Sequence, residues 1–437
     1  MTATAAPTQL DFGNPADLTG SLSTMVQKMR GSVILGIASE VRALIATGRP
    51  VCNLTVGDFD PKQFPIPALL RDGIVRALEA GETNYPPSDG MPAFRKAVVE
   101  YVARDQGVRY PVESVHITCG GRPIVYGAFR CLINPGDTVL FSVPSWNNDH
   151  YSHLSGAKSV EIPAGRETGF QPTLEQLAPH FADAKLLCLC TPGNPTGTVM
   201  EPEVLKSILE AVVEENARRA ISAQPRLFVL FDQMYGALVS PPARHFHPVA
   251  LVPDSAPFVI TIDGVSKAFA GTGLRAGWVM AAPAVISRMK DFLGHVGTWA
   301  PRAEQVATAE FLMNADAVAA FRRQMDAALR ARLDAVFTGF DLLKRDGYPV
   351  DCINPQGAIY LSLRLDLAGR TIGGKRIESN EEIRRLLLDQ AGVAVVPFQA
   401  FGLKDESGWF RLSVGAVSLT DIAEAFPRIR SLLDQVR

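Results

Sequence analysis

The sequence predicts an α/β protein in which a large unit with a mostly parallel sheet is followed by a smaller α+β unit. Between about residues 65 and 290, short and nearly continuous apolar runs alternate with helical stretches, a pattern typical of parallel strands that helices cover on both faces. After about residue 315 the pattern changes to a long helix, further strands and a final helix. A chain of 437 residues is also long for one hydrophobic core, so two domains are expected.

The N-terminal region, residues 1–60, is expected to pack with the smaller unit. Its first twenty or so residues are small and polar with prolines and glycines, which indicates a loose arm. Apolar residues then recur at positions 34, 35, 37, 38, 41, 44 and 45. This spacing predicts a helix that ends at Gly48.

Seven short apolar runs predict the strands of the large unit, which we place at residues 61–320. They lie at residues 114–118, 138–143, 158–163, 185–190, 226–231, 258–262 and 277–282. Helical stretches such as 123–133 and 201–220 separate several of them. The smaller unit, placed at residues 321–437, begins within a predicted helix at 317–340 and contains strand-like runs such as "GAIYLSLRL" and "WFRLSVG".

Composition excludes several classes of function. The formal net charge is -2, so no electrostatic footprint for nucleic acid or an anionic membrane is visible. No run reaches about 18 apolar residues, and the start shows no secretory signal. The six cysteines form no C-x-x-C pair, and the seven histidines form no H-E-x-x-H or Cys/His cluster. We therefore expect a cytoplasmic protein with reduced thiols and without a metal site.

Polar and aromatic side chains follow the predicted strands. In open α/β sheets, ligands bind beyond the carboxyl ends of the strands. Two glycines at 120 and 121 precede a helix there, an arrangement that suits an anion. The other residues after strand ends are Trp146, Asn194, Asp232, Tyr235, Ser266, Lys267 and Arg275.

This set matches what pyridoxal phosphate requires. That cofactor needs a lysine for its aldehyde, a carboxylate for its pyridinium nitrogen, donors to its ring oxygen, a stacking ring and a phosphate site. Ordinary explanations remain open for single residues. Lys267 could be a surface lysine, and Trp146 could be a core aromatic residue. Arg411, within an apolar strand, needs either a structural ion pair or a ligand.

Eight stretches carry a family resemblance that covers nearly the whole chain beyond residue 50. In order, they are "NYPPSDGMPAFR", "CGGRPIVYGAF", "PSW", "PGNPTG", "DQMYGAL", "SKAFAGTGLRAGW", "NPQGAIYLSL" and "FRLSVG". The chain resembles the fold type I pyridoxal-phosphate aminotransferases of class I/II, nearest the bacterial aspartate aminotransferase subgroup. The resemblance implies a seven-stranded type of sheet in the large domain, a smaller α+β domain and a homodimer.

The resemblance also implies a role for each matching residue. Lys267 would bond covalently to the cofactor and later move the substrate proton, and Asp232 would pair with the pyridine nitrogen. The other cofactor contacts implied are Asn194 and Tyr235 at the ring oxygen, Trp146 on the ring, and Gly121, Arg122 (through backbone amides), Ser266 and Arg275 at the phosphate.

Three further residues complete the implied site. Tyr85 would reach the phosphate of the neighbouring subunit, which is why a homodimer is expected. Arg411 would hold the α-carboxylate of the substrate, since a guanidinium binds a carboxylate through two hydrogen bonds. Gly57 would lie beside that carboxylate.

The chain departs from the family pattern at Gln233, Trp299 and Arg122, which bears on the substrate side-chain pocket. Arg122 is either an ordinary salt-bridge residue or a second cation that favours aspartate or glutamate as amino donor, with 2-oxoglutarate as acceptor. The alternatives are an aminotransferase for aromatic or other amino acids and a lyase with the same cofactor. A non-enzymatic sensor domain ranks last, because it needs a helix-turn-helix for which the N-terminal arm leaves no room.

Overall fold

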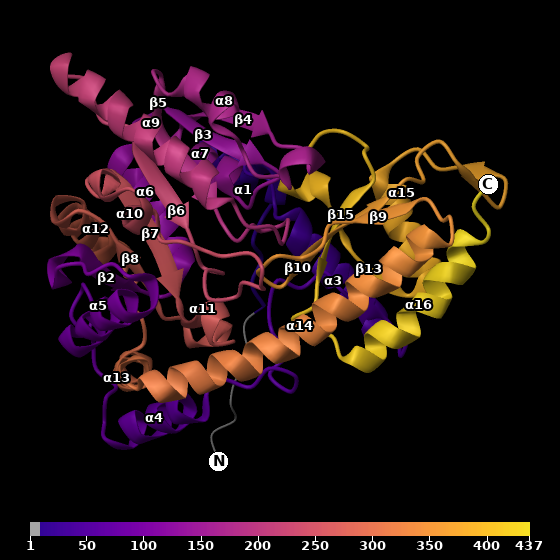
Figure 1. Ribbon diagram of the computed structural model, residues 1–437, viewed down its shortest axis with the longest axis horizontal. Coiled ribbons are helices and arrows are strands. Elements are labelled where there is room, and N and C mark those ends of the chain that lie inside the picture. Colours follow the sequence, from indigo (N-terminus) through magenta and orange to yellow (C-terminus); the bar gives the residue numbers. More distant parts are fainter. Residues whose placement is uncertain (1–8) are drawn as a thin grey trace.

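The computed structural model describes residues 9–437, whose strands form a seven-stranded sheet, a four-stranded sheet and two two-stranded pairs, with helices around them (Figure 1). The larger sheet has seven strands in the order β2-β8-β7-β6-β5-β3-β4. Their bounds are β2 Val115–Thr118, β3 Thr138–Val143, β4 Lys158–Pro163, β5 Ala184–Cys190, β6 Phe228–Asp232, β7 Val259–Gly264 and β8 Gly277–Met280. All seven predicted strands are therefore confirmed. Only β8 runs against its neighbours, so the sheet is mostly parallel.

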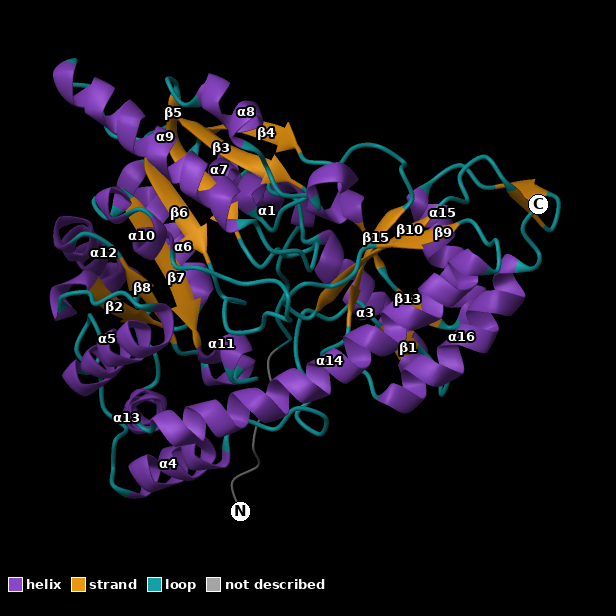
Figure 2. Ribbon diagram, in the orientation of Figure 1, coloured by secondary structure: helices purple, strands orange, loops and turns teal. Residues whose placement is uncertain are grey.

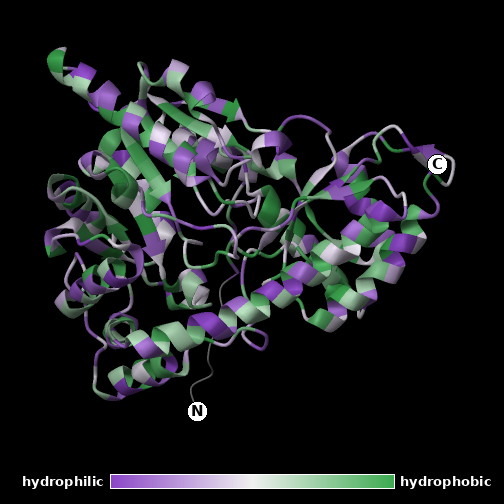
Figure 3. Ribbon diagram, in the orientation of Figure 1, coloured by the Kyte–Doolittle hydropathy of each residue, from purple (hydrophilic) through white to green (hydrophobic). Residues whose placement is uncertain are grey.

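Helices cover both faces of this sheet (Figure 2). One face packs mainly against α5 (Pro92–Gln106), α9 (Pro202–Ile221) and α13 (Arg302–Met313). The other packs against α6 (Gly121–Leu132) and α12 (Pro283–Val296). The central strands are accordingly apolar on both faces. Much of their length is coloured as hydrophobic in Figure 3. The remaining helices here are α4 Ala68–Glu79, α7 Asn148–Ser155, α8 Leu174–Leu177, α10 Pro248–Leu251 and α11 Val265–Ala268.

The second sheet is antiparallel, with strands in the order β14-β15-β10-β9. Its strands are β9 Val350–Cys352, β10 Tyr360–Leu365, β14 Val396–Pro397 and β15 Trp409–Ser413. The helices α15 (Asn380–Leu386) and α16 (Leu419–Leu433) belong to this part of the chain. Two short pairs complete it, β1 (Cys52–Asn53) with β13 (Val393–Ala394) and β11 (Thr371–Ile372) with β12 (Lys375–Arg376). This segregated α+β arrangement agrees with the predicted fold class.

The long helix α14, Ala315–Arg345, runs from beside α13 toward the second sheet (Figure 1). It extends beyond the predicted 317–340, and the side chain of Asn314 caps its first turn by accepting from the Ala317 amide. The expected boundary between residues 320 and 321 falls inside α14. The division into 61–320 and 321–437 therefore stays a prediction.

The N-terminal region contains more helix than the sequence predicts. Short helices α1 (Pro15–Gly20) and α2 (Thr24–Gln27) lie where an irregular arm is expected, because the side chains of Asn14 and Ser23 cap them. Residues 1–8 of the expected arm lie outside the described residues. Helix α3 (Val33–Ala46) confirms the predicted stripe and buries Ile37 and Val41 in a cluster with residues 388–409.

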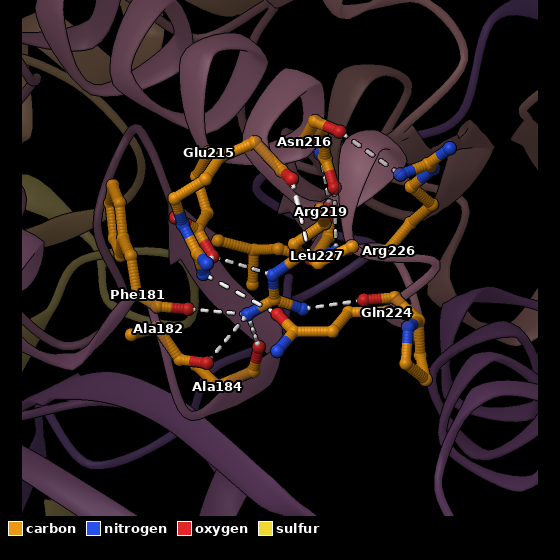
Figure 4. Close-up of polar contacts among 12 residues, drawn as sticks. Phe181, Ala182, Ala184, Glu215, Asn216, Arg219, Gln224, Arg226 and Leu227 are labelled. Carbon is orange, nitrogen blue, oxygen red and sulfur yellow. Dashed lines mark hydrogen bonds and ion pairs between the residues drawn. The ribbon is translucent and has the colours of Figure 1, made fainter.

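A buried arginine fastens α9 to the amino ends of two strands. Arg219 donates to the carbonyls of Phe181, Ala182 and Ala184, and its Nε pairs with the Glu215 carboxylate (Figure 4). It also donates to the Pro225 carbonyl, just before β6. Among the described residues, no helix is both long and apolar enough to cross a membrane.

Candidate active site

Three of the predicted cofactor residues, Asn194, Asp232 and Lys267, lie at the carboxyl ends of β5, β6 and β7. These strands are adjacent in the sheet, so the segments that follow them converge at one edge. Asp232 is the last residue of β6. Lys267 lies in α11, directly after β7. Asn194 follows β5 after a short turn. The convergence is a direct consequence of the parallel order of these three strands.

Lys267 lies in an environment that favours its neutral form. Its Nζ donates to the Gly57 carbonyl and lies 5.8 Å and 5.7 Å from the ring centres of Phe59 and Tyr235. Burial is the main reason that its pKa falls from the ordinary value to about 8. Because the side chain is partly buried and its Nζ donates to a backbone carbonyl of a distant segment, Lys267 is not an ordinary surface lysine. An amine with this pKa is partly unprotonated near neutral pH and can act as a nucleophile.

Asp232 presents a carboxyl group from the same edge. Burial raises its pKa to about 6, while the Met234 amide, which donates to Oδ1 at 3.0 Å, and the charge of Lys267 oppose the increase. A further positive charge nearby would hold this carboxyl ionised. Asp232 therefore suits a cationic ring nitrogen as its partner.

Two phenols lie next to the lysine. The hydroxyl oxygens of Tyr235 and Tyr360 are 2.5 Å apart, and their rings meet edge to face at 5.4 Å. Both side chains are buried, and burial raises the pKa of each. They therefore remain protonated donors. Sequence analysis singled out Tyr235 but missed Tyr360, which looks like an ordinary aromatic residue of an apolar strand.

Arg411 on β15 is buried, with 2% of its surface exposed, and has no acidic partner. It donates to the Thr55 carbonyl at 2.6 Å and to Oδ1 of Asn194 at 3.1 Å. Its guanidinium lies 4.7 Å from the ring centre of Tyr360. Within residues 9–437 it takes part in no ion pair, and its Nε has no hydrogen-bond partner. The structural ion pair is therefore excluded, and the guanidinium is available to an anionic ligand.

An anion cradle lies at the start of α6. Gly120 has a φ of 92°, and a Cβ there would lie 2.4 Å from Nη2 of Arg275. The Arg275 guanidinium donates to the carbonyls of Cys119 and Thr272 at 2.8 and 2.7 Å. Glycine at 120 thus lets a guanidinium approach the exposed amides at the first turn of α6, and both attract anions. Ser266 is buried beside Lys267 in the sequence.

Arg122 and Trp146 contact one another. The Arg122 guanidinium lies 4.8 Å from the Trp146 ring centre, a cation–π geometry. Arg122 is exposed and Trp146 is partly buried. No ion pair involves Arg122 within the described part of the chain, which removes the ordinary salt bridge. Trp146 also packs at the edge of the core, so its role as a core residue remains open.

Tyr85 points away from the residues described so far. Its side chain is 80% exposed, and its ring meets Trp299 edge to face at 5.1 Å. Tyr85, which the resemblance associates with a neighbouring subunit, is thus in contact with Trp299. Within residues 9–437, Trp299 leaves most of the Tyr85 side chain uncovered.

Gln233 lies behind the site and not in a substrate pocket. Its side chain is buried and bonded to Gln106 at 2.8 Å, Asp263 at 3.3 Å and His245 at 3.2 Å. Burial raises the pKa of Asp263 to about 7. The expectation that Gln233 bears on the side-chain pocket is corrected by this network, in which its amide joins β6 to β7.

Comparison with known proteins identifies the family. The sequence pattern of "Aminotransferase class I and II" matches residues 49–429. The chain is 32% identical to the aspartate aminotransferase of Streptomyces avermitilis over 95% of this chain and 97% of that one. It is 30% identical to the aspartate/prephenate aminotransferase of Cereibacter sphaeroides, over 94% and 98% respectively. The solved aspartate aminotransferase of Rhizobium meliloti superposes with a TM-score of 0.86 at 27% identity, covering 95% of this chain and 99% of that one.

The chain belongs to the class I and II aminotransferases of fold type I. It is a pyridoxal-phosphate-dependent enzyme that moves an amino group between an amino acid and an oxo acid. The residues present fit the cofactor. A lysine with a lowered pKa, a buried carboxyl group and a glycine-lined cradle at a helix start match its aldehyde, ring nitrogen and phosphate.

Proposed function

We propose that the converging residues hold the cofactor and the substrate α-carboxylate side by side, and that the preferred amino donor is a dicarboxylic amino acid. When bound, pyridoxal phosphate accepts the amino group and withdraws electrons from the substrate α-carbon. Two observations together support the proposal. The pKa of Lys267 is lowered, which favours its neutral amine, and Arg411 is buried without an acidic partner among the described residues.

Each cofactor contact follows from a group described above. Lys267 would hold the cofactor through its aldehyde, and its Nζ would move the proton at the substrate α-carbon. Asp232 holds the ring nitrogen in its protonated form. Asn194 accepts from Arg411 with its carbonyl oxygen, which leaves its N–H groups free to donate to the ring oxygen together with Tyr235. Trp146 stacks on the ring.

The cradle at the start of α6 would hold the phosphate. Gly121 and Arg122 supply backbone amides there, and Ser266 and Arg275 supply a hydroxyl and a guanidinium. Charge-assisted hydrogen bonds of this kind are among the stronger ones in proteins.

Arg411 binds the α-carboxylate of every substrate, with Gly57 beside it. A Cβ at position 57 would lie 2.7 Å from the Tyr360 hydroxyl and 3.7 Å from Nη1 of Arg411, so glycine keeps space open next to the guanidinium. The substrate carboxylate would supply the negative charge that the protein does not.

The preference for aspartate or glutamate, with 2-oxoglutarate as acceptor, rests on two supports. Relatives similar over nearly the full chain carry the names aspartate and aspartate/prephenate aminotransferase. Arg122 is an exposed second cation that can turn from the Trp146 face toward a distal carboxylate. The second candidate is an aromatic donor, because Trp146 and Trp299 could build an aromatic pocket instead.

A homodimer with shared sites is also proposed. The Tyr85 side chain is exposed and therefore contributes little to the packing of its own subunit. Its phenol hydroxyl can donate a hydrogen bond to the cofactor phosphate of the other subunit. A cytoplasmic location remains a prediction of the sequence.

The experiment that tests the proposal is a screen of the loaded enzyme against the natural amino acids. Each is added to the yellow protein, and loss of the visible absorbance is followed together with amino transfer to 2-oxoglutarate. Aspartate or glutamate should give the highest kcat/KM. A lead for phenylalanine would replace the dicarboxylate proposal with the aromatic one, and product formation without amino transfer would indicate a lyase.

A further inference from the structure

Residues 54–60 connect the second sheet with the lysine loop. On one side, Ser413 of β15 donates its amide to the Leu54 carbonyl at 2.8 Å and its hydroxyl to the Val56 carbonyl at 2.6 Å. Arg411 of the same strand donates to Thr55. On the other side, the Gly57 carbonyl accepts from Lys267. The segment therefore touches both the proposed carboxylate site and the reactive amine.

Asp58 fastens this segment to the loop that carries Lys267 and Arg275. Its Oδ1 accepts from the Thr272 hydroxyl at 2.5 Å and from the Phe59 amide at 2.8 Å. Thr272 lies between Lys267 and Arg275 in the sequence, and its carbonyl accepts from the Arg275 guanidinium. One threonine thus links the Asp58 carboxylate to the cation of the phosphate cradle.

Asp58 also contributes to the charge balance around the amine. The charged groups that act on Lys267 are the carboxylates of Asp58 and Asp232 and the guanidinium groups of Arg411 and Arg275. Burial lowers the pKa of Lys267, and Asp58 opposes that decrease more strongly than Asp232 does. Asp232, the carboxylate proposed to pair with the cofactor ring, therefore raises the pKa of Lys267 less than Asp58 does.

We propose that Asp58 is a positioning residue for the reactive amine, which holds the Gly57 carbonyl against Lys267 through Thr272 and supplies negative charge beside that amine. The inference rests on the proposed role of Lys267 and deepens it. Asp58 does not touch the reacting atoms; it acts through the lysine and its loop. Its charge keeps the nitrogen that Lys267 contributes protonated to a higher pH than Asp232 alone would.

The test is a pH titration of the visible absorbance of the loaded enzyme, which reports protonation of the nitrogen that joins Lys267 to the cofactor. Asp58→Asn keeps the shape of the side chain and an oxygen for Thr272 but removes the charge. The midpoint of the titration should fall by about one pH unit. An unchanged midpoint would overturn the inference, while the proposed role of Lys267 would stand as long as the wild type titrates.

Three more variants separate charge from fold. Asp60→Asn is the matched control, because Asp60 lies two residues away and caps the Lys62 amide; its midpoint should equal that of the wild type. Thr272→Val removes the anchoring hydroxyl and should shift the midpoint in the same direction as Asp58→Asn. Thr272→Ser keeps the hydroxyl and should restore the wild-type value. If Asp58→Asn does not fold, the valine and serine variants decide alone, and equal midpoints for the two would contradict the inference.

Discussion

Two buried arginines, one near the amino ends and one near the carboxyl ends of the strands of the large sheet, have different partners. Arg219, at the amino ends of β5 and β6, is paired with Glu215 and bonded to four backbone carbonyls. Arg411 meets Asn194 beyond the carboxyl end of β5, and its hydrogen-bond partners among the described residues are neutral. Their exposed fractions are 4% and 2%. Burial alone therefore does not separate a structural arginine from a functional one; the charge balance does.

The physical reason is the cost of an uncompensated buried charge. Removing one member of a buried pair costs roughly 3–5 kcal/mol, because the other charge is left without compensation. The protein meets this requirement with its own carboxylate at Arg219. At Arg411 the compensating negative charge would come from a bound ligand. Cation–π contacts with Tyr360 and Phe401 hold the guanidinium in place without it.

The largest effect is expected at the lysine next to Arg411. Lys267→Ala should lower turnover by roughly 10³-fold or more, because acid–base catalysis alone contributes about 10²–10⁴-fold. The pKa of Lys267 is lowered from 10.5 to about 8, so its burial costs stability below pH 10.5 and costs most below pH 8. The cofactor-free variant should therefore be at least as stable as the wild type at pH 7. Steady-state kinetics and thermal unfolding check both parts. Near wild-type transamination would contradict the assignment.

The two buried arginines should give opposite phenotypes when replaced: Arg411→Ala should lose activity, and Arg219→Ala should lose stability. Arg411→Ala should lower kcat/KM for all substrates by about ten- to hundredfold, the equivalent of roughly 1.5–3 kcal/mol for a charge-assisted hydrogen bond, with little loss of stability. Arg219→Ala should lower the free energy of unfolding by roughly 3–5 kcal/mol while kcat/KM of the folded fraction stays unchanged. Denaturant unfolding and kinetics on both variants test this. If both variants lost mainly activity, or both lost mainly stability, the distinction between a functional Arg411 and a structural Arg219 would be wrong.

Arg122→Ala tests whether this second cation binds the side-chain carboxylate of the substrate. It should reduce kcat/KM about tenfold or more for aspartate and leave phenylalanine and alanine nearly unchanged, because only a distal carboxylate would use this guanidinium. Kinetics with the three donors decide the matter. Equal loss for all three would mean that Arg122 acts on the cofactor or on Trp146 and not on the substrate.

The pH dependence of cofactor uptake tests the environment of Lys267. Only the neutral amine attacks the cofactor aldehyde, and the pKa of Lys267 is about 8. The rate at which cofactor-free enzyme turns yellow should therefore fall about tenfold per pH unit below pH 8 and level off above it. Stopped-flow absorbance measures this rate. A rate that still rises tenfold per unit toward pH 10 would show an ordinary exposed lysine.

Mixing two inactive variants tests the shared site. Equal amounts of Tyr85→Ala and Lys267→Ala subunits should regain about a quarter of the wild-type activity, because half of the dimers then contain one site with both natural residues. Activity is followed after subunit exchange, with each variant alone as control. Sedimentation that shows a fully active monomer would contradict the arrangement.

Much of the site was predictable because it follows from local pattern. Apolar runs locate the ends of β5, β6 and β7, so Asn194, Asp232 and Lys267 are found by asking what each strand carries next. The extent of α14 and the helices of the N-terminal region were less predictable, since caps at single residues decide them.

Contacts between distant segments could not be predicted from pattern. Asp58 and Thr272 are 214 residues apart, and an aspartate in a turn looks like any other. Tyr360 carries an apolar strand pattern, and only the fold brings its hydroxyl to Tyr235. Gln233 looked like a pocket residue because it follows Asp232, but in the fold its buried side chain bonds to Gln106 and Asp263.

The central claim, that Lys267 is the residue that binds the cofactor covalently, can be measured directly. The loaded enzyme is treated with borohydride, which makes the bond to the cofactor permanent, and is then digested and analysed by mass spectrometry. One modified peptide is expected, with the added pyridoxyl-phosphate mass on Lys267. The same mass on another lysine, or no modified peptide from yellow enzyme, would contradict it.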